Sequence, residues 1–117
     1  MPASRQRFYL VVPDLTQARG KIESLSFTGS TAESFAAQLQ AALREPALWQ
    51  RWRALQPDPD ALDPALGVCD RQANVNAQES DMQCNVQVTT SLPHAVLKQR
   101  LGFLIGAHWT LRDVTAA

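Results

Sequence analysis

The sequence predicts an α+β protein in two layers, with helices packed on one face of a mainly antiparallel sheet. This prediction depends on two kinds of hydrophobic period. Apolar and polar residues alternate in Met82–Thr89 and again in His108–Thr115, which is typical of half-buried strands. Between these two segments, and again in residues 31–45, apolar residues recur at the spacing of an amphipathic helix.

The length of 117 residues suits a single domain that spans the whole chain. A chain of this size buries roughly two thirds of its unfolded surface, so it needs no disulfide or metal to fold. Residues 1–5 are expected to form a flexible tail. Residues 56–66 hold three prolines among three aspartates, which predicts a loop.

Two strands are predicted before the first helix. Arg7–Val12 is rich in aromatic and β-branched residues, and its apolar run is typical of a strand in the middle of a sheet. Pro13 cannot donate to a ladder, so the pairing is expected to stop there. Lys21–Thr28 alternates again, with a break near Ser24 that indicates a bulge.

Two consecutive helical segments are predicted next. Ser30 and Glu33 match a capping box, so the first helix is expected to begin at this point. Pro46 disfavours helical geometry at the preceding residue, which predicts a break. A short second piece then covers Pro46–Leu55. One face of that piece carries Leu48, Trp49, Trp52 and Leu55.

A hairpin is predicted in the second half of the chain. Val68–Ala77 alternates as a third strand, and Gln78–Asp81 is a polar turn. A tight turn at that position places Val75 opposite Cys84. The same register keeps Cys69 away from Cys84 along the ladder. We therefore expect two reduced thiols rather than a disulfide.

The last predicted helix runs from Leu92 to about Ile105. The preceding hydroxyl residues can cap its free N–H groups, and a proline is tolerated in its first turn. Gly106 is expected to end it in the left-handed conformation. The apolar side chains are expected to face the sheet. The side chains expected to face outward are Lys98, Gln99 and Arg100.

In chain order these elements are β-β-α-β-β-α-β. Strand–helix–strand units cross over a sheet in a right-handed sense, so the simplest result is one sheet with the helices on a single face. This arrangement is a ferredoxin-like β-α-β-β-α-β sandwich with an extra N-terminal strand. The resemblance is to an architecture, because no motif in the chain indicates a family.

Composition and length argue against two kinds of partner. Eleven basic and eleven acidic residues cancel, which removes the broad electrostatic attraction for nucleic acid. Val68–Ala77 also lacks the aromatic residues on which RNA-binding sheets stack bases. No apolar run approaches the roughly 20 residues of a membrane span. Phe8–Val12 is too short for a signal peptide, so we expect a cytoplasmic protein without nucleic-acid or membrane partners.

The chain shows no catalytic constellation that is recognisable by spacing. Phosphate-binding glycine loops and a nucleophile elbow are both absent. No closely spaced pair of Cys or His residues predicts structural zinc, so no metal and no other cofactor is expected. The available thiol–base pairing is Cys69 with His94 or His108. A small enzyme or ligand-binding protein with a site near Cys69, Asp70 and His94 is the alternative function.

The predicted function is a non-enzymatic interaction or regulatory module that forms a homodimer, through the sheet face or an edge strand, or binds another protein. Trp49 and Trp52 lie close to arginines in the sequence, and this combination is found both in protein cores and at interface hot spots. Asn85, Gln87 and Thr89 place amide and hydroxyl groups on one sheet face, which is open either to solvent or to a partner. The candidate binding residues are Asn85, Gln87, His94, Arg100, Trp49 and Trp52.

Overall fold

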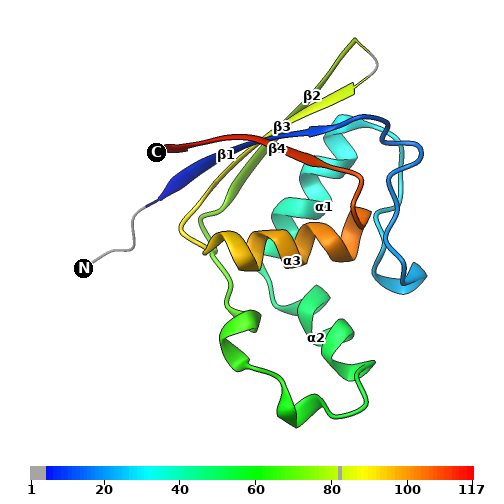
Figure 1. Ribbon diagram of the computed structural model, residues 1–117, viewed down its shortest axis with the longest axis vertical. Coiled ribbons are helices and arrows are strands. Elements are labelled where there is room, and N and C mark those ends of the chain that lie inside the picture. Colours follow the sequence, from blue (N-terminus) through cyan, green and yellow to red (C-terminus); the bar gives the residue numbers. More distant parts are fainter. Residues whose placement is uncertain (1–4, 82) are drawn as a thin grey trace.

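The computed structural model describes residues 5–81 and 83–117. Residues 1–4, most of the predicted tail, and Met82, the expected first residue of a strand, lie outside these ranges. Three short 3₁₀ turns occupy Glu23–Leu25, Pro59–Ala61 and Pro64–Gly67. The strands and α-helices of the described residues (Figure 1) are β1 (Gln6–Val12), α1 (Ala32–Arg44), α2 (Ala47–Ala54), β2 (Asn74–Ser80), β3 (Gln83–Thr90), α3 (His94–Ile105) and β4 (Thr110–Ala116).

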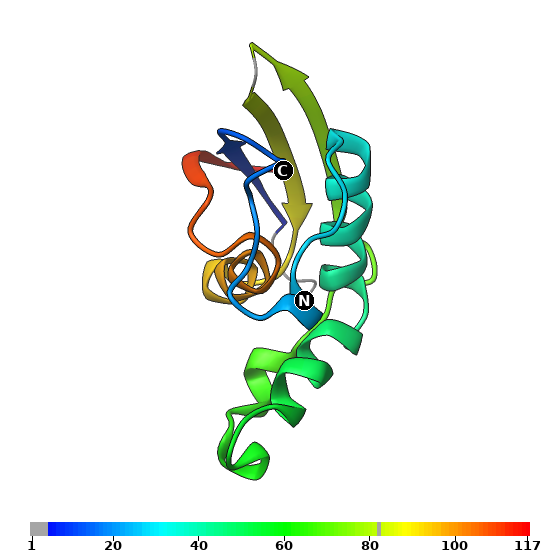
Figure 2. The ribbon, with the colours of Figure 1, turned by 90° about the vertical axis from the view of Figure 1, so that its right-hand side faces the viewer.

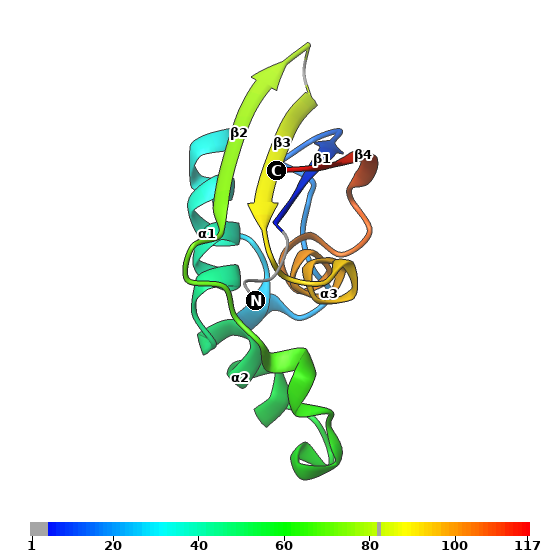
Figure 3. The ribbon, with the colours of Figure 1, turned by 90° about the vertical axis from the view of Figure 1, so that its left-hand side faces the viewer.

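The four strands form one antiparallel sheet in the order β2-β3-β1-β4. Figure 1 views this sheet along its edge and shows α1 and α3 beneath one face, while none of the described helices covers the other. The predicted α+β class and the antiparallel sheet with helices on one face are therefore confirmed. Figures 2 and 3 show α2 and the 56–67 segment beyond the end of the sheet.

The core lies between the helices and the covered face of the sheet. Alternate residues of the two central strands are buried there, which is the pattern that a period of two produces. Each fully buried side chain of this size stabilises the fold by about 1.5–3 kcal/mol. The main contributors are Phe8, Leu10 and Val12 from β1, Val86 and Val88 from β3, Phe35, Leu39 and Leu43 from α1, and Leu97, Leu101 and Ile105 from α3.

The predicted second strand over Lys21–Thr28 is wrong. Every residue of this segment is described, and it contains a 3₁₀ turn but no strand. Leu25 and Phe27 are buried as alternate strand residues would be. However, the Phe27 N–H donates to the Leu104 carbonyl of α3 at 2.8 Å. The alternation therefore reflects packing against a helix rather than pairing within the sheet.

The predicted third strand is displaced along the chain. β2 begins at Asn74 rather than Val68, and it includes residues 78–80, which were predicted as turn. Val75 consequently lies opposite Val88 instead of Cys84. The strand ends at Ser80, and Asp81 follows it in the turn with a positive φ of 51°, which aspartate tolerates in tight turns. Because the register shift is even, Val75 remains on the buried face.

The helix ends follow local chemistry with small displacements. The capping box of α1 is formed by Thr31 and Ser34 rather than by Ser30 and Glu33. The predicted break before Pro46 is confirmed, because α1 ends at Arg44 and α2 begins at Ala47. At the end of α3, Gly106 has a φ of 60°, a conformation that glycine adopts without steric cost.

Arg100, which was predicted to face outward, is instead fully buried with 0% exposure. It lies four residues from both Val96 and Leu104, and residues at that spacing share one face of a helix. Its Nη2 atom donates to the carbonyls of Leu66 at 2.9 Å and Val68 at 3.1 Å. The prediction followed the charge of the side chain, whereas its position on the buried stripe of α3 decides its environment.

Candidate functional site

The uncovered face of the sheet is rich in side-chain amides. Asn85 and Gln87 lie on it, alternating along β3 with buried residues. Residues paired directly across a ladder share a face, so their partners lie there too. These partners are Asn76 and Gln78 on β2 and Tyr9 and Val11 on β1. Amides both donate and accept hydrogen bonds, so this face can bind polar surfaces of many kinds.

A hollow of about 380 Å³ lies on this face. The pairing of β1 with β4 is interrupted there, since Tyr9 lies opposite Asp113 and Leu10 opposite Leu111. Arg112 is the extra residue of this bulge, and bulges commonly redirect a side chain. The hollow is of ligand size. Its lining includes Tyr9, Val11, Asn76, Gln78, Asn85, Gln87 and Arg112.

Both edges of the sheet carry features that oppose pairing with another strand. At the β2 edge, the Val75 N–H donates to Gln40 Oε1 at 3.1 Å, and Arg44 Nε donates to the Ala73 carbonyl at 2.6 Å. At the β4 edge, the bulge and the charged Arg112 interrupt a regular ladder. Bulges and charges of this kind are common protections against edge-to-edge association. Both edges are therefore protected against pairing with another strand.

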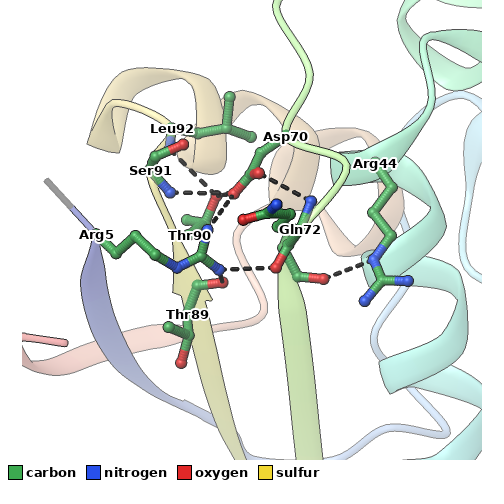
Figure 4. Close-up of polar contacts among 9 residues, drawn as sticks. Arg5, Arg44, Asp70, Gln72, Thr89, Thr90, Ser91 and Leu92 are labelled. Atoms are coloured by element: carbon green, nitrogen blue, oxygen red, sulfur yellow. Dashed lines mark hydrogen bonds and ion pairs between the residues drawn. The ribbon is translucent and has the colours of Figure 1, made fainter. Parts of the chain in front are cut away.

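Asp70 joins three parts of the chain that are distant in sequence (Figure 4). Its Oδ1 accepts a hydrogen bond from the Gln72 N–H at 2.9 Å. Its Oδ2 accepts from the Thr90 hydroxyl at 2.7 Å and from the Ser91 N–H at 3.1 Å. Arg5 Nη1 lies 3.5 Å from the same oxygen and forms an ion pair with it. The carboxylate thus connects the segment before β2 to the entrance of α3.

The pKa of Asp70 reflects these contacts. Burial by itself raises the pKa of this carboxyl, but the hydrogen bonds from Thr90, Ser91 and Gln72 and the charge of Arg5 outweigh it and hold the pKa below its usual value. A carboxylate with all these donors is kept ionised and is poorly suited to proton transfer near neutral pH. Asp70 therefore serves as a structural clamp in this fold.

The two cysteines are free thiols in different environments. Burial, together with the charge of Glu79, raises the pKa of the Cys84 thiol to about 11, so this thiol is unreactive near neutral pH. Cys69 is half-buried and lines a hollow beside Arg44 and Arg71. The structure thus distinguishes a buried inert thiol from one that borders an open, positively charged space.

His94 lies exposed in the first turn of α3. Its imidazole stacks on the ring of Phe8, with centroids 5.8 Å apart and an interplanar angle of 20°. Within residues 5–81 and 83–117 it forms no hydrogen bond with Cys69 or Asp70. These three residues of the alternative site are therefore not joined by a nucleophile–base hydrogen bond in this structure.

The two tryptophans of α2 have different surroundings. Trp49 is buried, and its indole packs against the backbone at Gly67. Trp52 is half-buried, with its ring 5.2 Å from that of Phe103 and tilted by 30°. Leu55, which was predicted to share their face, is 55% exposed. Trp49 thus belongs to the interior, and Trp52 lies at the margin of the core.

Several residues of these surfaces were missed by sequence reasoning. Tyr9 was hidden in the continuous apolar run of β1, although a tyrosine hydroxyl in such a run is a signal that one face meets polar surroundings. Arg112 could not be selected from the sequence, because the bulge that directs it has no signature there. Arg44 and Arg71 are distant in sequence, and only the fold places them beside the same hollow.

Comparisons of the chain with protein-family models, curated proteins and solved structures return no match. None of the helices in the described ranges has the length and apolar character that a bilayer crossing requires. The same residues contain no group of three or more His, Cys, Asp or Glu side chains placed to hold a metal ion. The structure thus defines a two-layer α+β protein with one amide-rich sheet face left open.

Proposed function

We propose that this protein is a non-enzymatic interaction module that pairs with a second copy of itself through the open face of its sheet. The observation that carries the proposal is the surface at the centre of that face. Val11 is only 7% exposed and Tyr9 is half-buried, although none of the described helices covers them. A partly dehydrated centre within a polar surround is the anatomy of an interface.

The chemistry of the face favours a second copy over an unrelated partner. A two-fold interface brings the same surface of both copies together, so it requires groups that complement themselves. Amides meet this requirement, because each carries both a donor and an acceptor. The same face also carries opposite charges, with Arg7 and Asp113 on β1 and β4. Two sheets stacked in this way lie about 10 Å apart.

The proposal includes a finer assignment of the fold. The strand order β2-β3-β1-β4 and the element order β-α-β-β-α-β support a ferredoxin-like sandwich, with α2 as an insertion and without the predicted strand over Lys21–Thr28. We also propose a cytoplasmic location, which is in line with two free thiols. A fold of this kind hosts many activities, so the function is argued from the surface and not from the fold.

Light scattering after size exclusion, at micromolar to 100 micromolar protein, tests the dimer. The double variant Asn85→Asp, Gln87→Glu places like charges against each other across the two-fold axis. We expect the wild-type protein to be a dimer and the variant to dissociate about tenfold or more readily. Gln50→Glu adds a charge to an exposed position on α2 and should remain dimeric. A wild-type protein that is monomeric throughout this concentration range would overturn the proposal.

A further inference from the structure

A second hollow, of about 590 Å³, lies away from the open sheet face. It is formed where the end of α1 and the start of α2 meet the segment that precedes β2. Its lining residues are Arg44, Glu45, Pro46, Gly67, Cys69 and Arg71. Two guanidinium groups and one carboxylate therefore border this space, which leaves it with an excess of positive charge.

The two arginines of this hollow have donors available to a ligand. Arg44 is held in place by its Nε, which donates to the Ala73 carbonyl at 2.6 Å, while its terminal nitrogens have no hydrogen bond in the described part of the chain (Figure 4). Arg71 is exposed and forms no ion pair or side-chain hydrogen bond with the described residues. Neither arginine is within ion-pair distance of Glu45, so their charges are not neutralised there.

The wall of the hollow is supported from behind by a third arginine. Arg100 Nη2 donates to the carbonyls of Leu66 and Val68, which flank the lining residue Gly67. The Nε and Nη1 atoms of Arg100 are buried and have no partner among the described residues. A buried charge without a counter-charge is costly, so an anion bound close to this guanidinium would stabilise it.

Two further observations agree with this requirement. Desolvation lowers the pKa of Arg100, because burial removes the water that would stabilise its charged form. In addition, α2 begins at the hollow with Pro46 as its N-cap and has no side-chain cap. The partial positive charge of its first turn is therefore not offset by a capping side chain.

We propose that this hollow binds a small dianionic oxyanion of the phosphate or phosphate-monoester class, held by Arg44 and Arg71 with the Arg100 charge behind the wall. The two lining guanidinium groups and the one lining carboxylate leave an excess of one positive charge, to which the buried Arg100 adds its charge from behind the wall. A phosphate monoester carries about −1.5 to −2 charges at pH 7, whereas a simple carboxylate carries one, so the dianion matches better. Arginine also matches phosphate oxygens in geometry, with paired N–H donors.

Thermal unfolding of the full chain tests this site, with inorganic phosphate compared to sodium chloride at the same pH and ionic strength. Saturating phosphate should raise the Tm of the wild-type protein by roughly 5 °C. Arg71→Gln should lose most of this shift, because Arg71 lines the hollow without supporting the fold. Arg51→Gln removes an exposed arginine of α2 that does not line the hollow, and it should retain the shift.

Alkylation of Cys69 by neutral iodoacetamide gives a second readout. Phosphate should slow this reaction severalfold in the wild-type protein but not in Arg71→Gln, while buried Cys84 serves as the internal control. An equal Tm shift in Arg71→Gln and Arg51→Gln, or unchanged alkylation of Cys69 in phosphate, would overturn the proposal. The Asn85→Asp, Gln87→Glu variant should keep the full phosphate response, which separates this site from the proposed dimer.

Discussion

Asp70 shows how a single side chain organises the junction between the sheet and α3. It is 8% exposed, and it accepts three hydrogen bonds in addition to its ion pair with Arg5. The Thr90 hydroxyl that donates to it also accepts from the Leu92 N–H at 3.1 Å. The carboxylate therefore fixes the residues that lead into α3, whose N-cap Pro93 makes no side-chain hydrogen bond.

Replacement of Asp70 by asparagine should lower stability in a pH-dependent way. Because the folded-state pKa of Asp70 is below the unfolded one, its contribution is fully present above the usual value of 3.8 and is lost as the pH falls through the folded-state pKa. At pH 7 we expect Asp70→Asn to cost about 2 kcal/mol. Urea unfolding at pH 7, 5 and 3 should show this difference shrinking at the lowest pH. A constant difference would contradict the assigned role.

At the scale of the elements, the contact between α2 and the 64–67 turn depends on the absence of a side chain. A Cβ atom at Gly67 would lie 2.9 Å from the Trp49 ring, closer than real contacts allow. Gly102 differs, because a Cβ in its place on α3 would meet open space. Gly67 is therefore required by packing, whereas Gly102 is unfavourable for the helix that contains it.

Alanine at these two glycines should change stability in opposite directions. Gly67→Ala is expected to destabilise the protein by about 1–3 kcal/mol, because the buried indole cannot move away without disturbing its neighbours. Gly102→Ala is expected to stabilise it by up to about 1 kcal/mol through helix propensity. Equilibrium unfolding in urea measures both changes. If Gly67→Ala proves neutral, α2 and the turn do not pack as described.

The whole molecule is narrow across its sheet, with extents of 44, 38 and 19 Å. The strands lie side by side along the shortest extent, and α2 with the 56–67 segment lies at the end away from the sheet (Figures 1 and 3). A dimer formed through the open faces places these segments at its two far ends. A dimer formed through edge strands instead places two sheets next to each other across the narrow direction.

Small-angle X-ray scattering distinguishes these two dimers. Pairing through the faces should give an elongated particle whose maximum dimension is well above the 44 Å of one copy. Pairing through the edges should give a more compact particle, because it doubles the shortest extent. We expect the elongated form, and the Asn85→Asp, Gln87→Glu variant should return the profile of a single copy. A compact dimer would move the interface from the face to an edge.

Short-range patterns in the sequence determined much of this protein. The alternation of β3, the helical stripe of α1, the break before Pro46 and the glycine at the end of α3 each follow from the chemistry of neighbouring residues. Side-chain period and cap chemistry act over a few positions, so they can be recognised without a fold. Asn85 and Gln87 were predicted to lie on the outer sheet face for the same reason.

The tertiary structure alone decided which surfaces these elements meet. Leu25 and Phe27 alternate with polar residues like the residues of a strand, yet they pack against α3. An extended segment that is buried on one side shows this alternation whether a sheet or a helix covers it. Arg100 is charged, yet the 64–68 segment covers it. Arg44, Cys69 and Arg71 come together only when α1 lies beside the segment before β2. Long-range packing brings such residues together, and no local pattern in the sequence records it.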